Sequence, residues 1–335
     1  MERLEQKTLK TRRSLNYTYY ASTAGESKLQ QEPALLFLHG FPDSAHLWTR
    51  VLGALEDLPH QVIVPDCLGY AGTDKPSDTS LYAYHQQAQD LEDLLRHERV
   101  DKAILIGHDW GSALAQRLYL HKRHLVSGVI LLNTAYMVPS GERFDLAAVN
   151  SMTEKAFGYP QFAYWEFLLT PDAAQIVDQH LERMWQVLHG DVEHWMKRIF
   201  CVPGAMCNFL LGDDEVPLKD YARQPEWKQR YLQQFRSDGF AAALQMYKAT
   251  AWNIQAESDS ALLSGDLAIR VPLLFVICSK DAVCMREMMA PAKERGLVPN
   301  LTEVVVDAGH WSPMERPEEI AQQIRDFVSQ ATFKN

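Results

Sequence analysis

Short apolar runs alternate with stretches of helical periodicity over most of the chain, and this alternation limits the possible folds. Six such runs predict strands buried on both faces, at residues 34–38, 62–64, 103–106, 129–132, 273–278 and 302–306. Amphipathic stretches at 83–95, 112–120 and 318–329 predict helices between or after them. The pattern favours an α/β fold with a mainly parallel sheet flanked by helices. In such sheets, active sites lie beyond the carboxyl ends of the strands.

The alternation is interrupted between residues 136 and 256. Apolar strand-like runs are missing there, and Trp, Tyr, Phe and Met recur with mostly helical spacing. We therefore predict a core formed by residues 1–135 and 257–335, with a helical cap at 136–256 inserted over the strand ends. Aromatic side chains of the cap then line an apolar pocket or pack the interior of the cap itself.

Composition excludes several classes of function. The chain has 335 residues and a net charge of -10, without the clustered Lys and Arg that nucleic-acid binding requires. The segment 1–13 is charged, so we expect no signal peptide, no membrane span and a cytoplasmic protein. The five cysteines are irregularly spaced and form no CxxC pair, which argues against a zinc or redox site. No motif indicates an organic cofactor or a metal.

The most informative motif is Gly107-His-Asp-Trp-Gly111, between a predicted strand and a predicted helix. It matches the nucleophile elbow, in which small flanking residues allow a sharp turn that raises the central side chain above the sheet. Here that residue is Asp109 instead of the usual serine. An Asp before a helix is also typical of an N-cap, so the assignment depends on the other motifs.

One of those motifs is the loop His39-Gly40-Phe41-Pro42, which follows the first predicted buried strand. In folds with a nucleophile elbow, this loop supplies the second donor of the oxyanion hole. We therefore predict an oxyanion hole formed by the backbone N–H groups of Phe41 and Trp110.

Two later strands each lead into a residue suited to assist a nucleophile. Asp281 follows the strand at 273–278, and His310 follows the strand at 302–306. The order along the chain is nucleophile, acid, histidine, as in hydrolase triads built on an elbow. Either residue alone is usually a turn residue, but together with Asp109 they predict a catalytic triad.

The chain resembles the epoxide hydrolases of the α/β-hydrolase fold, which are related to the soluble epoxide hydrolases. The resemblance runs from about residue 32 to about residue 328 and rests on several motifs. One motif departs from the family pattern, with Ala71 where the family usually has Gly in Gly-Tyr-Gly. The motifs are His39-Gly-Phe-Pro42, Asp66-Cys-Leu-Gly-Tyr-Ala-Gly-Thr-Asp-Lys-Pro76, Gly107-His-Asp-Trp-Gly111, Leu132-Asn-Thr134, Ser279-Lys-Asp281 and Gly309-His-Trp311.

The resemblance implies further site residues. Two cap tyrosines hydrogen-bond the epoxide oxygen in that family, and local similarity assigns them to Tyr164 and Tyr247; a buried tyrosine with a satisfied hydroxyl is the alternative for each. We also assign substrate binding to His39, Gly40, Pro42, Trp48 and Trp311.

The implied reaction needs no cofactor. Asp109 attacks a carbon of a small apolar epoxide and forms an ester, while the tyrosines donate to the oxygen. His310, oriented by Asp281, then activates the water that releases a vicinal diol.

Two alternatives stay open at this point. A haloalkane dehalogenase shares the Asp nucleophile but needs N–H donors for halide, such as an indole pair or an Asn in the oxyanion loop. This chain has Phe41 where that Asn would lie, and uncharged Asn133 where several dehalogenases carry their acid. A protein of this fold that binds a small ligand without catalysis is the other alternative. The sequence also leaves the oligomeric state and the particular epoxide open.

Overall fold

The computed structural model describes residues 1, 3–22 and 32–330. Its centre is an eight-stranded sheet with the order β1-β2-β4-β3-β5-β6-β7-β8. The strands from β4 to β8 in this order are parallel, while β2 pairs antiparallel with both β1 and β4. The strands are β1 (Leu4–Lys10), β2 (Asn16–Ser22), β3 (Ala34–Leu38), β4 (Val62–Pro65), β5 (Ala103–His108), β6 (Val126–Leu132), β7 (Leu273–Cys278) and β8 (Leu301–Val306).

All six predicted strands are present, and the predicted mainly parallel sheet is confirmed. The ends of β3 and β7 agree with the prediction, and every residue of β3, β5 and β7 is buried. The expectation that each strand is buried on both faces is wrong for β8. Because β8 is the last strand of the sheet, much of it contacts solvent, and Val305 is 57% exposed.

The sequence analysis missed the hairpin of β1 and β2. Strand β1 reads LEQKTLK and has no fully buried residue, so its sequence carries no apolar face to reveal it. Its strand character comes from a seven-residue antiparallel ladder with β2. The hairpin extends the sheet on the side away from the predicted triad.

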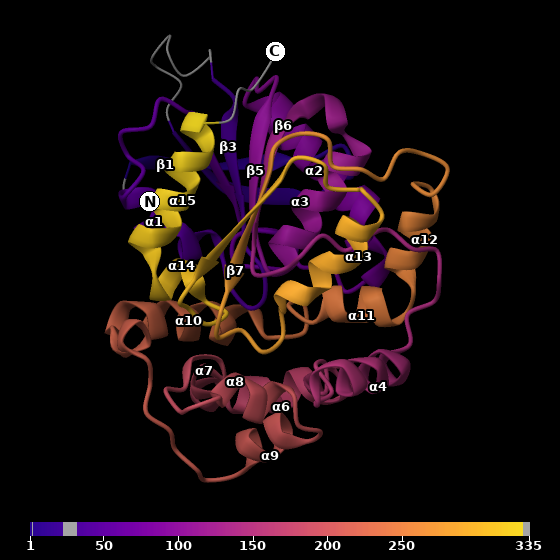
Figure 1. The fold of residues 1–335 in the computed structure, drawn as a ribbon. Coiled ribbons are helices and arrows are strands. Elements are labelled where there is room, and N and C mark those ends of the chain that lie inside the picture. Colours follow the sequence, from indigo (N-terminus) through magenta and orange to yellow (C-terminus); the bar gives the residue numbers. More distant parts are fainter. Residues whose placement is uncertain (2, 23–31, 331–335) are drawn as a thin grey trace.

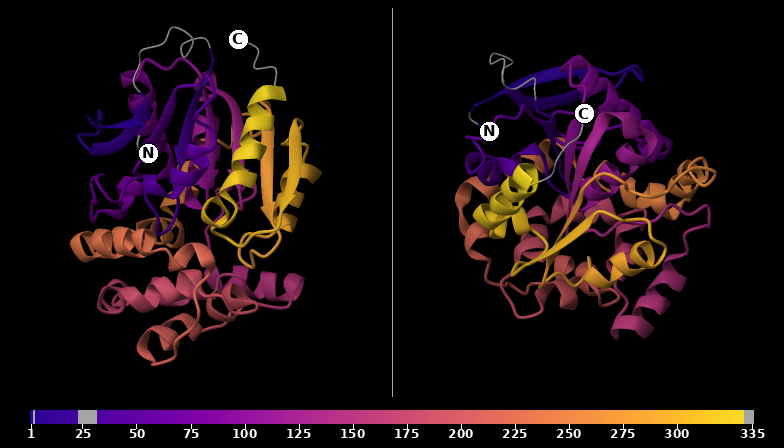
Figure 2. Two further views of the ribbon diagram at one scale, coloured as in Figure 1. Left: turned by 90° about the vertical axis from the view of Figure 1, so that its left-hand side faces the viewer. Right: turned by 45° about the horizontal axis from the view of Figure 1, so that its top comes forward.

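Helices cover both faces of the sheet (Figures 1 and 2). On one face α2 (Tyr84–His97) packs on α3 (Trp110–His121), and α3 packs on β5 and β6. On the other face α1 (Thr49–Gly53) packs on α15 (Pro317–Gln330), with α14 (Ser312–Glu315) beside them. Within the described part of the chain, no helix is both long enough and apolar enough to cross a bilayer.

Between β6 and β7 the chain forms a run of helices. Figure 1 shows α4 and α6 to α9 below one end of the sheet, separated from it by α10 and α11. These helices are α4 (Leu146–Phe157), α5 (Tyr164–Leu168), α6 (Ala173–Gln179), α7 (Leu181–His189), α8 (Trp195–Phe200), α9 (Ala205–Leu211), α10 (Pro225–Asp238), α11 (Gln245–Ala251) and α12 (Ile254–Ser260). We call residues 146–260, from α4 to α12, the helical insertion; it is followed by β7 and then α13 (Ala290–Glu294).

The last helix of the insertion packs against the helices that flank the sheet. Helix α12 packs on α2, and the Arg117 guanidinium of α3 donates to both carboxylate oxygens of Asp259 at 2.7 and 2.6 Å. Both side chains are buried, so this ion pair joins α12 to the core. The predicted end of the cap at residue 256 falls inside α12; the domain limits themselves stay a prediction.

Candidate active site

The nucleophile elbow lies between β5 and α3. Asp109 has φ 55° and ψ -123°, a conformation that non-glycine residues rarely adopt. The turn is tight because a Cβ on Gly111 would overlap the backbone of Leu38, and one on Gly107 would overlap Ser112. The two glycines therefore allow α3 to begin directly against the sheet, with the side chain of Asp109 above the strand ends.

Backbone donors from two loops reach the Asp109 carboxylate. The Phe41 N–H donates to Oδ1 at 2.8 Å, and the Trp110 N–H also bonds this carboxylate. Burial raises the pKa of Asp109, while the charge of His310 and these two N–H groups act in the opposite direction. Gly40 keeps the loop close, since a Cβ there would overlap Asp109 Oδ1. Both N–H groups predicted for the oxyanion hole thus contact one carboxylate, and their role in catalysis stays a prediction.

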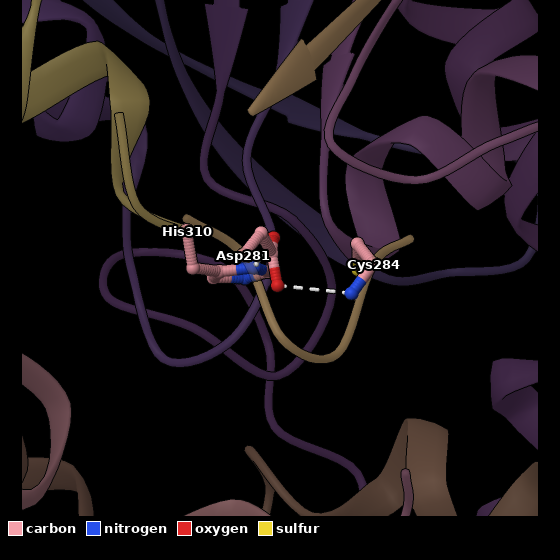
Figure 3. A group of neighbouring side chains, drawn as sticks. All are labelled: Asp281, Cys284 and His310. Carbon is pink, nitrogen blue, oxygen red and sulfur yellow. Dashed lines mark hydrogen bonds and ion pairs between the residues drawn. The ribbon is translucent and has the colours of Figure 1, made fainter. Parts of the chain in front are cut away.

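Asp281 follows β7, and both of its carboxylate oxygens accept hydrogen bonds. Its Oδ2 accepts from His310 Nδ1 and from the Asn133 side chain, both at 2.7 Å. Its Oδ1 accepts from the backbone N–H groups of Val283 and Cys284, both at 2.9 Å. Burial alone would raise the pKa of Asp281, but His310 and the hydrogen bonds lower it to about 2. Figure 3 shows Asp281 between His310 and the backbone of Cys284.

His310 connects the two carboxylates. Its Nδ1 bonds Asp281, and its Nε2 lies 3.6 Å from Asp109 Oδ2. Burial lowers the pKa of His310, but the charge and hydrogen bond of Asp281 outweigh burial and raise it well above the usual value. Behind it, His108 Nε2 lies 2.8 Å from the His310 carbonyl oxygen. Because burial lowers the pKa of His108 to about 3, His108 is neutral and donates this bond.

Both predicted tyrosines lie in the helical insertion, next to the elbow. The Tyr247 ring is 5.3 Å from the Trp110 ring and 5.0 Å from the Phe41 ring, and the Tyr164 ring is 6.0 Å from the Tyr247 ring. Burial and then nearby negative groups, Asp109 among them, raise the pKa of both tyrosines well above 10. Both phenols therefore keep their protons at neutral pH and can donate them.

The predicted substrate-binding residues lie in different surroundings. His39 is buried; its Nε2 accepts from the Cys67 N–H at 2.9 Å and its Nδ1 lies 3.0 Å from the Gly40 carbonyl, so it shapes the oxyanion loop. Pro42 lines a cavity that also reaches Trp185 and Tyr231. Trp48 is fully buried against Phe37 of β3, with ring centroids 5.1 Å apart, in surroundings typical of a core residue.

Trp311 leads to a residue that the sequence analysis missed. Its indole Nε1 donates to Asp43 Oδ2 at 3.2 Å, and its ring lies 4.9 Å from the His310 ring. Burial and then the charge of Asp109 raise the pKa of Asp43 to about 7. Asp43 directly follows the His39–Pro42 motif, and this adjacency was the available signal. The hydrogen bond from Asn133 to Asp281 had no signal in the spacing of the chain.

One group of side chains in the described residues has the donor types of a metal site. The ligand atoms of Asp281, Cys284 and His310 lie within 4.8 Å of one another (Figure 3). However, Asp281 Oδ2 and His310 Nδ1 already bond each other. Burial also raises the pKa of the Cys284 thiol to about 11, so it is not a thiolate. The donor set does not fit a metal ion.

The chain is similar in sequence to known proteins over most of its length. The chain is 28% identical over 312 residues to epoxide hydrolase A of Mycobacterium tuberculosis, which covers 89% of this chain and 90% of the relative. It is 26% identical over 301 residues to bifunctional epoxide hydrolase 2 of Rattus norvegicus, covering 87% of this chain but only 50% of that protein.

A solved structure supports the fold over the whole length. Epoxide hydrolase A from Mycobacterium thermoresistibile has a TM-score of 0.79 and 24% identity, with 99% of this chain and 100% of that chain covered. The pattern of the family described as "alpha/beta hydrolase fold" matches residues 33–317. With its elbow, its oxyanion loop and its Asp281–His310 pair, the chain belongs to the α/β-hydrolase fold family.

Proposed function

We propose that this protein is an epoxide hydrolase that converts a small apolar epoxide to a vicinal diol through an ester on Asp109. The observation that carries the proposal is the division of the Asp109 carboxylate. Oδ1 accepts from the Phe41 N–H at 2.8 Å, whereas Oδ2 lies 3.6 Å from His310 Nε2. In this proposal Oδ1 occupies the oxyanion hole, and Oδ2 attacks a substrate carbon.

In the first step Asp109 Oδ2 forms a bond to an epoxide carbon, and the bond between that carbon and the ring oxygen breaks. A carboxylate is ionised at neutral pH and needs no base to activate it. The oxygen that leaves gains negative charge, and protonated phenols at Tyr164 and Tyr247 suit it as donors. Phe41, Trp110 and Tyr247 provide aromatic walls around this point.

In the second step water attacks the carbonyl carbon of the ester. His310 takes the proton of that water, because esterification removes the negative charge of Asp109 that favours the imidazolium. The negative charge that develops on Oδ1 faces the N–H groups of Phe41 and Trp110. When this charge returns to the carbonyl carbon, the bond between Asp109 Cγ and Oδ2 breaks, and Oδ2 leaves with the diol and takes the proton from His310. Asp281 keeps the ring of His310 oriented through its 2.7 Å bond.

The proposal includes a cytoplasmic location for the protein. All five cysteines are free thiols, which is consistent with the expected cytoplasmic location. The expectations of no nucleic-acid partner and no cofactor stay predictions.

Product analysis separates this function from its alternatives. Incubation with styrene oxide is expected to give phenylethane-1,2-diol, with 1-bromobutane tested in parallel. If the protein releases bromide from 1-bromobutane but forms no diol from any epoxide of a panel, it would be assigned to the dehalogenases instead. Binding of both compounds without any product would identify a ligand-binding protein.

A further inference from the structure

Four aromatic rings from the core and the helical insertion meet beside Asp109. Trp110 lies 5.8 Å from Trp165 and 5.3 Å from Tyr247, measured between ring centroids. Trp165 lies 4.9 Å from Tyr247 and 6.4 Å from Tyr164. Trp165 follows Tyr164 directly in α5, whereas Trp110 follows Asp109 directly in the elbow. Every one of these rings carries one polar N–H or O–H group.

The indole N–H groups of Trp110 and Trp165 are buried and form no regular hydrogen bond. Most buried donors in proteins are paired, because an unpaired one loses its bond to water without replacement. Each indole also lies close enough to a tyrosine hydroxyl to favour the phenolate form: Trp165 lowers the pKa of Tyr164, and Trp110 lowers that of Tyr247, against the larger effect of burial. Two indoles and two phenols therefore bring their polar groups close together, and Tyr247 also bonds the hydroxyl of Tyr164.

The missing partner of these donors is an acceptor with negative charge. A resting Asp109 carboxylate repels an anion at this point, and its charge already raises the pKa of both tyrosines. Once Asp109 is an ester, that repulsion is gone. At that moment the ring-opened oxygen carries the negative charge, and an unpaired N–H donor stabilises it more than it stabilises the neutral epoxide.

We propose that the indole N–H groups of Trp110 and Trp165 complete, with the hydroxyls of Tyr164 and Tyr247, a four-donor anion site that holds the ring-opened oxygen and that also accepts a halide ion. The inference rests on the proposed function, which it deepens. Tyrosine supplies the proton that converts the alkoxide to a hydroxyl group, and it regains a proton in the second step, when the carboxyl group of Asp109 formed by hydrolysis ionises. The indoles keep their protons and contribute hydrogen bonds only.

The first experiment measures ester formation by single turnover with styrene oxide. Trp165→Phe keeps an aromatic ring but removes the N–H, and it is expected to slow ester formation about 10- to 100-fold, as for the loss of one oxyanion donor. Trp110→Phe keeps its backbone N–H and is expected to give a similar loss. Ester hydrolysis should stay unchanged in both, because the oxygen is already neutral in that step.

Trp227→Phe is the matched control. Its indole N–H is also buried without a partner, but its ring lies near Arg50, away from the two tyrosines. It should leave both rate constants unchanged. The proposal would be overturned if Trp165→Phe slowed ester formation less than twofold or no more than Trp227→Phe does. It would also be overturned if Trp165→Phe slowed ester hydrolysis as much as ester formation.

The second experiment uses bromide alone as the probe. Asp109→Asn removes the negative charge and imitates the neutral ester. Bromide binding to this variant should therefore broaden the bromide-81 NMR signal. Adding Trp165→Phe should weaken binding about tenfold, since a hydrogen bond to a charged group is lost. Adding Trp227→Phe should not. Equal broadening in all three proteins would contradict the anion site.

The two experiments separate this inference from the proposed function. If no epoxide is opened by the unmutated protein, the proposed function fails, whereas bromide binding that depends on Trp165 still supports the anion site. If epoxides are opened and Trp165→Phe has no effect in either experiment, the anion site fails and the proposed function stands.

Discussion

The two halves of the site differ in how completely their polar groups are hydrogen-bonded. On the sheet side, the Asp281 carboxylate accepts four hydrogen bonds, from His310, Asn133 and two backbone N–H groups. On the side of the helical insertion, the Trp165 indole is buried without a regular partner. The hydrogen bonds of Asp281 are thus in place before any substrate binds, while the Trp165 N–H keeps the capacity for a regular hydrogen bond.

This difference has a physical consequence for catalysis. The hydrogen bonds around Asp281 hold His310 in one orientation. His310 therefore does not need to reorient before it activates water. Unpaired buried donors are costly in the resting protein and are relieved only when an acceptor arrives. In the proposed mechanism, the sheet side therefore prepares the second step, and the helical insertion stabilises the product of the first.

The largest effect is expected where the two halves meet. Asp109→Ala removes the only group that forms the intermediate, so turnover should fall by about 10⁴-fold or more. Steady-state diol formation measures the loss, and thermal unfolding checks that the variant folds. Retention of about one per cent of activity would reject Asp109 as the nucleophile.

Weakening the hydrogen bonds between Asp281 and its neighbours should slow the second step, ester hydrolysis, alone. Asp281→Asn is expected to slow ester hydrolysis about 10³- to 10⁴-fold, as for the loss of the acid in other triads. His310 accepts a proton only when neutral, so the rate rises with pH through its pKa. Because Asp281 raises that pKa, the rise should move to lower pH in the variant.

Asp307→Asn serves as the control for this prediction, since Asp307 is an exposed carboxylate that bonds Lys280 and Ser279. It should leave the pH profile unchanged. A slower first step in Asp281→Asn, with hydrolysis intact, would mean that the division of labour between the two halves is wrong.

Removing donors from the helical insertion should affect the first step. Tyr164→Phe and Tyr247→Phe are each expected to slow ester formation about 10- to 100-fold, and the double variant far more. Stopped-flow single turnovers measure this rate. Tyr136→Phe removes a hydroxyl that bonds Leu267 outside the site and is the control. A double variant as fast as the parent would favour the dehalogenase alternative.

The smallest effect is on stability at acid pH. The pKa of Asp281 is about 2 in the folded protein, below the unfolded value of about 3.9, so its ionisation stabilises the fold above pH 4. This contribution, about 3 kcal/mol, should disappear as the pH falls from about 4 through about 2. Urea unfolding of the parent and of Asp281→Asn should differ less at pH 2 than at pH 5. A constant difference would contradict the paired carboxylate.

The sequence predicted the sheet side of the site better than the side of the insertion. Asp109, Asp281 and His310 each follow an apolar strand, and strand ends in a parallel sheet meet at one edge. Strand periodicity therefore located all three without coordinates. Asn133 is near a strand end too, but its bond to Asp281 depends on a positive φ of 66° that no spacing reveals.

The helical insertion was less predictable because helical spacing does not fix how helices pack. Tyr164 and Tyr247 came from resemblance alone, and Trp165 was counted only among the aromatics of the cap. Whether an indole N–H is paired depends on contacts between α5, α11 and the elbow, which are far apart in the chain. Likewise, α12 joins the core through Arg117 and Asp259, and no local pattern indicated this.

The most direct test of the account is the ester itself. His310→Gln should leave the first step intact but block hydrolysis, because the base is gone while Asp109 can still attack. After mixing with styrene oxide, mass spectrometry should find one added substrate mass per chain, on the peptide that contains Asp109. Diol formation by this variant at the parent rate, or an adduct on any other residue, would contradict a covalent mechanism through Asp109.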